Sequence, residues 1–162
     1  MPIVYLGLGS NLDAEENLRL ASRELRNRFS LQKISAVYRN KAQGFDGDDF
    51  LNAVVCIETG LTPHDMCSEL EIIHDVAGRN RTSERFSSRT LDIDLLLYDQ
   101  LVLNDPPVRV PRKDVLKFSF VLGPLAEIAP DYRHPVSGRL ISEHWREFDI
   151  ASHPITVVGD IL

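Results

Sequence analysis

The chain has 162 residues, of which 43% are hydrophobic and 26% charged, and its formal net charge is −6. These values indicate one globular domain and exclude a disordered or coiled-coil chain, and the net acidity argues against a partner such as duplex nucleic acid. Two cysteines are too few for a disulfide framework or a zinc site, and the absence of an apolar run of ~18 residues argues against a membrane partner, so we expect a cytoplasmic protein.

Hydrophobic periodicity predicts strands and helices along the whole chain. After a first strand with weak alternation, Leu18, Ala21 and Leu25 recur at helical spacing. Thr62 as N-cap and Pro63 in the first turn mark the start of a second helix. In chain order, the predicted elements are a strand over 3–8, a helix over 14–29, strands over 31–39 and 50–58, a helix over 63–77, strands over 91–98, near 101–103 and 108–110, and helices over 113–129 and 140–147.

The order of the first six elements, β-α-β-β-α-β, predicts an α+β fold with a ferredoxin-like split βαβ antiparallel sheet and helices packed on it. No internal repeat or linker divides the chain, so we expect a single domain over residues 1–162. Residues 40–49 are a polar segment that contains glycine, which predicts a loop. Residues 79–90 are polar and lack periodicity, which predicts a mobile surface loop.

Arginines gather in this second loop, although the chain is acidic overall. Arg79, Arg81, Arg85 and Arg89 fall within eleven residues. The planar guanidinium group suits bidentate recognition of phosphate, so the cluster indicates a site for a small anionic ligand. The alternative is a solvated loop with scattered surface charge.

Two aspartates follow the arginines on the predicted strand 91–98. Asp92 and Asp94 lie on the same face of that strand, ~7 Å apart. Two carboxylates that face one space repel each other unless a cation lies between them, and Mg²⁺ commonly takes one or two protein carboxylates together with phosphate oxygens. With arginines nearby, the pair favours a site that holds a polyphosphate for in-line transfer, whereas a solvated strand face is the alternative.

Asn52 is a single polar residue on an otherwise apolar strand. It lies beside Phe50, a combination that suits recognition of a flat heterocycle. The alternative is a core asparagine whose amide is satisfied by a neighbouring backbone group. No Walker loop, kinase catalytic loop or Rossmann fingerprint is present, which argues against the common nucleotide-binding folds.

Five sequence blocks, in order across residues 3–140, resemble the 6-hydroxymethyl-7,8-dihydropterin pyrophosphokinase family. The resemblance implies a monomeric enzyme of folate biosynthesis that transfers the βγ-pyrophosphate of ATP to the hydroxymethyl group of a reduced pterin and releases AMP. The five blocks are Tyr5 to Asn11, Phe50 to Ala53, Gly78 to Arg81, Arg89 to Leu95 and Phe120 to Pro130.

The resemblance also implies roles for individual residues. The expected catalytic set holds two Mg²⁺ ions on its two aspartates and binds phosphate with its three arginines; it comprises Arg79, Arg81, Arg89, Asp92 and Asp94. The expected pterin site has two rings that sandwich the substrate and polar groups that bind it; it comprises Phe50, Phe120, Asn52, Asn40 and Gln43. The expected nucleotide site comprises Glu71, His74, Leu95, Arg109, Arg112 and Lys113.

Several positions differ from the pattern typical of the family. Phe118 stands in place of an arginine, His74 in place of a glutamate, and Arg112 follows Pro111 where histidine is usual. Residues 40–44 replace an apolar loop sequence that contacts the pterin, and Phe86 replaces a tryptophan. Two other functions therefore stay open, namely a non-catalytic pterin- or nucleotide-binding paralogue and a pyrophosphokinase for a related heterocycle.

Overall fold

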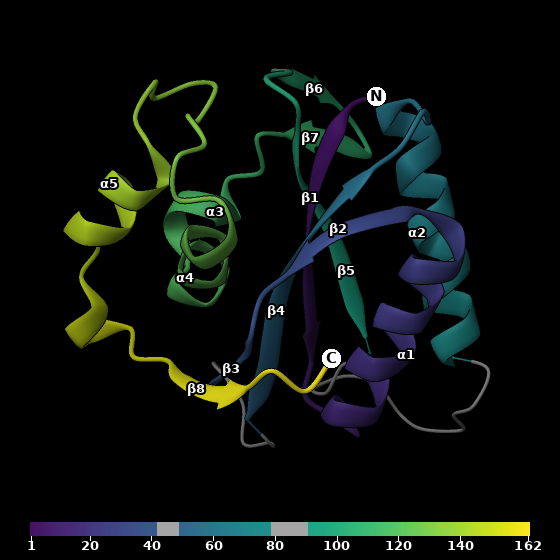
Figure 1. The fold of residues 1–162 in the computed structure, drawn as a ribbon, viewed down its shortest axis with the longest axis horizontal. Helices are drawn as coiled ribbons and strands as arrows, with labels where there is room; N and C mark the ends of the chain where they lie inside the picture. Colours follow the sequence, from purple (N-terminus) through teal and green to yellow (C-terminus); the bar gives the residue numbers. More distant parts are fainter. Residues whose placement is uncertain (42–48, 79–90) are drawn as a thin grey trace.

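A computed structural model describes residues 1–41, 49–78 and 91–162 of the protein (Figure 1). Six strands form one antiparallel sheet in the order β5-β1-β4-β3-β8, and β2 pairs with β4 as well. A separate hairpin consists of β6 and β7. The strands are β1 (Ile3–Ser10), β2 (Ser30–Ile34), β3 (Val37–Asn40), β4 (Phe50–Glu58), β5 (Asp92–Tyr98), β6 (Leu103–Asp105), β7 (Val108–Val110) and β8 (Thr156–Gly159).

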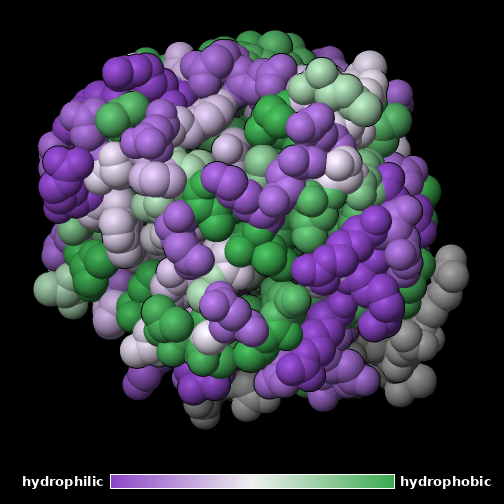
Figure 2. Space-filling model, in the orientation of Figure 1, coloured by the Kyte–Doolittle hydropathy of each residue, from purple (hydrophilic) through white to green (hydrophobic). Residues whose placement is uncertain are grey.

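Helices cover both faces of the central strands. The helices α1 and α2 pack on one face and α3 and α4 on the other, with α5 beyond α4 (Figure 1). Figure 2 shows hydrophilic side chains over the outer surface of α1, as its amphipathic sequence predicts. The helices are α1 (Ala14–Arg28), α2 (Pro63–Gly78), α3 (Asp114–Lys117), α4 (Ser119–Ile128) and α5 (Ile141–Glu147), and a short 3₁₀ turn spans Ile150–Ser152.

The two faces of β1 and β4 enter two different hydrophobic clusters. Leu6 and Val55 pack with α1 and α2, whereas Tyr5 and Val54 pack with α4. Because successive strand residues point to opposite faces, a strand covered on both sides becomes apolar throughout. This explains the apolar run in β4 and confirms the α+β prediction of a sheet with helices packed on it.

The segment predicted as one strand over 31–39 is divided into β2 and β3. Both pair with β4, but the register shifts by one residue between Ile34, opposite Val55, and Tyr38, opposite Asn52. At the break, the Ser35 hydroxyl accepts the backbone N–H of Val54 at 2.9 Å. The Ser35 N–H still donates to the Val54 carbonyl at 2.9 Å, so side-chain hydrogen bonds supplement the backbone ladder where the strand is interrupted.

The segment predicted as one helix over 113–129 is also divided. Phe118 is extended, with φ −115° and ψ 130°, and separates α3 from α4. Its carbonyl oxygen accepts the N–H groups of Val121 and Leu122, so the second helix starts afresh after it. The predicted end before Pro130 is confirmed, since α4 ends at Ile128.

The remaining predictions hold with small shifts. The Thr62 hydroxyl accepts the N–H of Asp65 at 3.2 Å, which confirms its role as N-cap of α2. The strand predicted near 101–103 lies at 103–105, and β8 was not predicted. The loop predictions for 79–90 and for most of 40–49 fall outside the described residues. None of the described helices is long and apolar enough to cross a membrane.

Candidate active site

The floor of the candidate site is made by three neighbouring strands. Asp92 of β5 lies opposite Gly9 of β1, which in turn lies opposite Asn52 of β4. Asp94 lies opposite Gly7 in the next pair on the same face. A methyl group added at Gly9 would lie 3.0 Å from Asn52 Oδ1. The two glycines therefore keep the space between the carboxylates and the asparagine open.

A cleft of about 430 Å³ rises from this floor. Asn40 and Asn52 line it and are both buried, and the Asn52 amide nitrogen donates to Asn40 Oδ1. This contact fixes the amide so that its oxygen lies above Gly9, at the floor of the cleft. The cleft therefore presents an oriented amide acceptor to any ligand that enters it.

Aromatic rings form the walls of this cleft. Phe50 enters from β4, while Phe118 and Phe120 enter from the start of α4. The rings of Phe118 and Phe120 are stacked, with centroids 5.0 Å apart and planes inclined by 19°. The Lys117 ammonium lies over the Phe118 ring, 5.2 Å from its centroid. The cleft thus combines flat apolar walls with a polar floor, which suits a planar heterocycle.

A second cleft, of about 590 Å³, lies between α2, β5 and the hairpin. Three side chains line both clefts, namely Asp92, Asp94 and Arg112, so the carboxylate pair lies where the two clefts meet. Of the residues predicted for the nucleotide, the second cleft brings together Glu71, His74, Leu95, Arg109 and Arg112. Lys113 lines neither cleft; it borders a third hollow on the other side of Arg112.

The charges at the junction are arranged around Asp94. Burial raises the pKa of Asp94, the carboxylates of Asp92 and Asp114 add to this effect, and Arg112 and His74 oppose it. Arg112 Nη2 lies 3.7 Å from Asp94 Oδ1, and Arg112 Nε lies 3.3 Å from Asp114 Oδ2. The pKa of Asp94 is thus raised despite the arginine, and a further cation beside Asp94 would favour its ionised form.

These donors fit a hard divalent cation. Within 1–41, 49–78 and 91–162 no group of three ligand side chains assembles, and Asp92 and Asp94 are the carboxylates that line both clefts. Magnesium is commonly bound by one or two carboxylates, and substrate phosphates and water complete its octahedron. The open floor at Gly7 and Gly9 leaves room for such ligands next to Asp92 and Asp94.

Some predicted residues cannot be placed, and some placed residues were not predicted. Gln43, Phe86 and the arginines Arg79, Arg81 and Arg89 lie outside the described residues. Asp114, which pairs with Arg112 and lines the first cleft, was missed because nothing in its local sequence marks it. The open floor at Gly7 and Gly9 could have been predicted from the sequence, because two glycines at period two leave one face of a strand without side chains.

Comparisons with known proteins show to which family the chain is similar. The family model described as 7,8-dihydro-6-hydroxymethylpterin-pyrophosphokinase (HPPK) matches residues 5–130. The 2-amino-4-hydroxy-6-hydroxymethyldihydropteridine pyrophosphokinase of Aquifex aeolicus is 36% identical over 147 residues, 88% of this chain and 90% of the relative. The enzyme of the same name from Methylorubrum extorquens is 38% identical over 153 residues, 92% of this chain and 95% of the relative.

A likeness in structure extends to a more distant protein. A crystal structure of Plasmodium falciparum HPPK-DHPS superposes with a TM-score of 0.73 at 12% sequence identity. The match covers 91% of this chain but 43% of that longer chain. It shows the same fold in a protein whose sequence has diverged far from this one.

Proposed function

The chain belongs to the 7,8-dihydro-6-hydroxymethylpterin-pyrophosphokinase family, and on this basis we propose that it transfers the βγ-pyrophosphate of ATP to 6-hydroxymethyl-7,8-dihydropterin, releases AMP and serves folate biosynthesis. The observation that carries the proposal is the position of Asp92 and Asp94, at the junction of an aromatic cleft and a second cleft. An acceptor in one cleft and a nucleotide in the other would meet at this junction.

The aromatic cleft is the proposed pterin site. Phe50 and Phe120 offer ring faces for stacking, and the buried amides of Asn40 and Asn52 offer hydrogen bonds to the edge of the heterocycle. The hydroxymethyl group of a pterin bound in this way would point along the floor of the cleft toward Asp92. We assign Gln43 to the same site on the basis of family resemblance.

The second cleft is the proposed nucleotide site. Glu71, Leu95 and Arg109 line it and would surround the nucleoside, and the triphosphate would extend toward Arg112. Asp92 and Asp94 would hold two Mg²⁺ ions, which when bound neutralise and orient the triphosphate. Lys113, together with Arg79, Arg81 and Arg89, is assigned to phosphate binding by family resemblance.

The proposed transfer is an in-line displacement at the β-phosphorus. The hydroxymethyl oxygen forms a bond to this phosphorus, the bond from it to the oxygen bridging the α-phosphorus breaks, and AMP leaves with that oxygen. The hydroxyl proton passes to water. The residues of this chain contribute by holding both substrates in line and by placing Arg112 beside the developing negative charge.

One chain supplies residues to both clefts, so we propose that the protein acts as a monomer. As an enzyme that consumes ATP, it is proposed to act in the cytoplasm. A pterin-binding protein without transferase activity is the second candidate, because Phe118 places an apolar ring where an arginine is usual in the family.

Substitution of Asp94 tests the proposal. The purified protein is expected to form AMP from ATP only when Mg²⁺ and the pterin are both present, and Asp94→Ala is expected to abolish this reaction while the fold is retained. Asp131→Ala, which removes an exposed carboxylate outside both clefts, is the matched control and is expected to be active. Full activity in Asp94→Ala would contradict the proposed site, and pterin binding without AMP would favour the second candidate.

A further inference from the structure

Both ring nitrogens of His74 are engaged within the protein. The backbone N–H of Ile93 donates to His74 Nε2 at 2.9 Å, and His74 Nδ1 lies 3.1 Å from Glu71 Oε1. Because Nε2 accepts a hydrogen bond, the proton of the neutral imidazole resides on Nδ1, which donates to Glu71. Glu71 thus selects the tautomer that allows the ring to accept from the backbone.

The N–H group that His74 accepts from belongs to the edge of the sheet. β5 is an edge strand, paired with β1 on its inner side, and Ile93 lies opposite Leu8 in that pairing. The backbone N–H groups on the outer side of an edge strand have no partner within the sheet. His74 therefore connects the outer side of β5 to α2 at the residue between Asp92 and Asp94.

We propose that His74 is a positioning residue for the carboxylate pair. Its hydrogen bond holds the backbone of Ile93, so that Asp92 and Asp94 present both carboxylates to the divalent cations at the junction of the two clefts. This inference rests on the proposed function and deepens it, since it assigns a residue of the nucleotide cleft to cation binding. Loss of the bond weakens binding of the divalent cation and leaves the stacking walls of the pterin cleft unchanged.

The fold does not depend on this bond. The side chain of Ile93 is 3% exposed and belongs to the same hydrophobic cluster as Ile73 of α2, so apolar packing holds the strand against the helix. A variant at His74 is therefore expected to fold. A direct contact of His74 with the nucleotide is the competing role, and it would require the ring to give up one of its two present partners.

The test compares His74→Phe, which keeps a ring but loses the acceptor, with His74→Gln, whose amide oxygen is able to accept from Ile93. The Mg²⁺ concentration for half-maximal velocity, at saturating ATP and pterin, is expected to rise about fivefold or more in His74→Phe. The kcat at saturating Mg²⁺ is expected to stay within about twofold of wild type, and His74→Gln is expected to recover most of the loss. His64→Phe, on the same helix but outside both clefts, is the matched control.

Two further readouts need no catalysis. Amide hydrogen exchange at Ile93 is expected to be faster in His74→Phe than in wild type and slower again in His74→Gln. Calorimetric titration of Mn²⁺ in the presence of α,β-methylene-ATP is expected to show weaker Mn²⁺ binding in His74→Phe than in wild type. The affinity of His74→Gln for Mn²⁺ is expected to lie between these two. If the wild-type protein formed no AMP, the proposed function would fail, yet these two measurements would still decide the role of His74.

Three outcomes would overturn the inference. The first is a wild-type cation affinity and Mg²⁺ dependence in His74→Phe. The second is an equal loss in His74→Phe and His74→Gln. The third is a raised KM for ATP at saturating Mg²⁺ with an unchanged half-saturating Mg²⁺ concentration, which would make His74 a direct nucleotide contact.

Discussion

Asp94 is half-buried beside a second carboxylate, and both conditions disfavour its ionised form. The same conditions prepare it to bind a cation, because a divalent ion would offset the repulsion between the carboxylates of Asp94 and Asp92. The residue is therefore placed for function at a cost to the stability of the protein without ligand. Asp92 and Asp94 were predicted as a metal pair from their period-two spacing, the arginines nearby and the family resemblance, and the structure brings both to one junction.

Asp94→Asn is expected to raise the Tm of the protein without ligand at pH 7 and to abolish transfer. A carboxyl whose pKa is raised by folding binds its proton more tightly in the folded state, so its ionisation destabilises the fold as pH rises above the ordinary value near 3.8. The difference in Tm between Asp94→Asn and wild type is expected to become smaller as pH falls toward 3.8. Thermal melts across this range check the prediction, and a lower Tm for the variant at pH 7 would contradict it.

Gly9→Ala is expected to lower kcat/KM for the pterin about tenfold or more. The added methyl group would lie 3.0 Å from Asn52 Oδ1, and Asn52 is buried and bonded to Asn40, so it has little room to move. Gly60→Ala is the matched control, because its nearest contact is Met1 Sδ at 3.8 Å. Steady-state kinetics with each substrate varied provides the measurement; an unchanged value for Gly9→Ala would mean that this floor does not bind the pterin.

At the scale of elements, the two breaks that sequence reasoning missed have tertiary causes. The strand predicted over 31–39 is interrupted at Ser35 and Ala36, where the partners of the backbone are Val54 and Glu127. Periodicity within a window of residues does not contain partners that lie 91 positions away. The break at Phe118 arises similarly, since its ring stacks on Phe120 in the cleft wall rather than continuing a helical stripe.

Glu127 connects α4 to the break between β2 and β3. Its carboxylate accepts the Ala36 N–H at 3.2 Å and the Tyr38 hydroxyl at 2.6 Å. Glu127→Ala is expected to lower the free energy of unfolding by about 1–3 kcal/mol, because the Ala36 N–H loses its partner in a part-buried setting. Glu127→Gln keeps one acceptor and is expected to lose less. Urea unfolding measures the free energy of unfolding of both variants. Equal stability of Glu127→Ala and Glu127→Gln would show that the hydrogen bonds of the Glu127 side chain contribute little.

Phe118 is expected to support the pterin site through its stack with Phe120. Phe118→Ala removes this support, so the KM for the pterin is expected to rise about threefold to tenfold while the KM for ATP stays near wild type. Phe118→Leu restores apolar volume without a ring. Its KM for the pterin is expected to lie between the values of wild type and Phe118→Ala. Kinetics with each substrate varied distinguishes the effects, and a rise confined to the KM for ATP would place Phe118 at the nucleotide instead.

At the scale of the whole molecule, much of the architecture follows from local sequence. The N-cap of α2 and the apolar run of β4 hold in the structure, and the β-α-β-β-α-β order holds except that its second strand is divided into β2 and β3. The edge strand β8 was missed because Thr156–Gly159 is short and none of its residues is buried, and its place in the sheet is set by its pairing with β3. The proposed carboxylate pair was predicted from residues of one strand, β5, whereas the contact of Arg112 with Asp94 joins residues of different segments and was not predicted.

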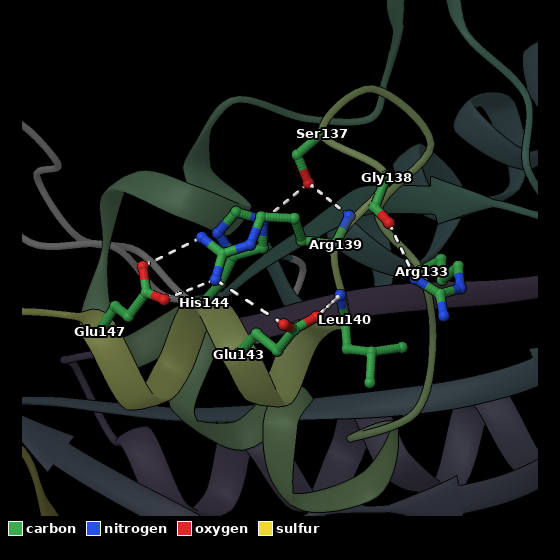
Figure 3. Close-up of polar contacts among 8 residues, drawn as sticks. All are labelled: Arg133, Ser137, Gly138, Arg139, Leu140, Glu143, His144 and Glu147. Atoms are coloured by element: carbon green, nitrogen blue, oxygen red, sulfur yellow. Dashed lines mark hydrogen bonds and ion pairs between the residues drawn. The ribbon is translucent and has the colours of Figure 1, made fainter.

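The turn before α5 makes the stability of the fold depend on pH. In Figure 3, Ser137 Oγ contacts His144 Nε2 at 2.7 Å, and Arg139 pairs with Glu147. In the same turn, His134 Nδ1 accepts the backbone N–H groups of Val136 and Ser137, each at 3.2 Å. Burial lowers the pKa of His134, and nearby His144 lowers it further.

A histidine whose pKa is lowered by folding takes up its proton first in the unfolded state, so its contribution to stability is complete above about pH 6.5 and is lost as pH falls below this value. The free energy of unfolding is therefore expected to decrease as pH falls from 7 to 5. His134→Asn, whose side-chain oxygen also accepts N–H groups, is expected to flatten this dependence. Urea unfolding of wild type and His134→Asn at several pH values checks this prediction. If the free energy of unfolding depends on pH equally in both proteins, groups other than His134 cause the dependence.

Asp92 and Asp94 are proposed to lie where a pterin and the triphosphate of ATP meet, so that pyrophosphate passes from ATP to the pterin there. Phosphorus NMR of the protein with ATP, Mg²⁺ and 6-hydroxymethyl-7,8-dihydropterin tests this proposal most directly, because the spectrum identifies every phosphorylated product. AMP and a pterin diphosphate are expected in equal amounts, with no ADP. A spectrum that keeps ATP intact while calorimetry still detects pterin binding, or one that shows ADP and a pterin monophosphate, would contradict the proposal.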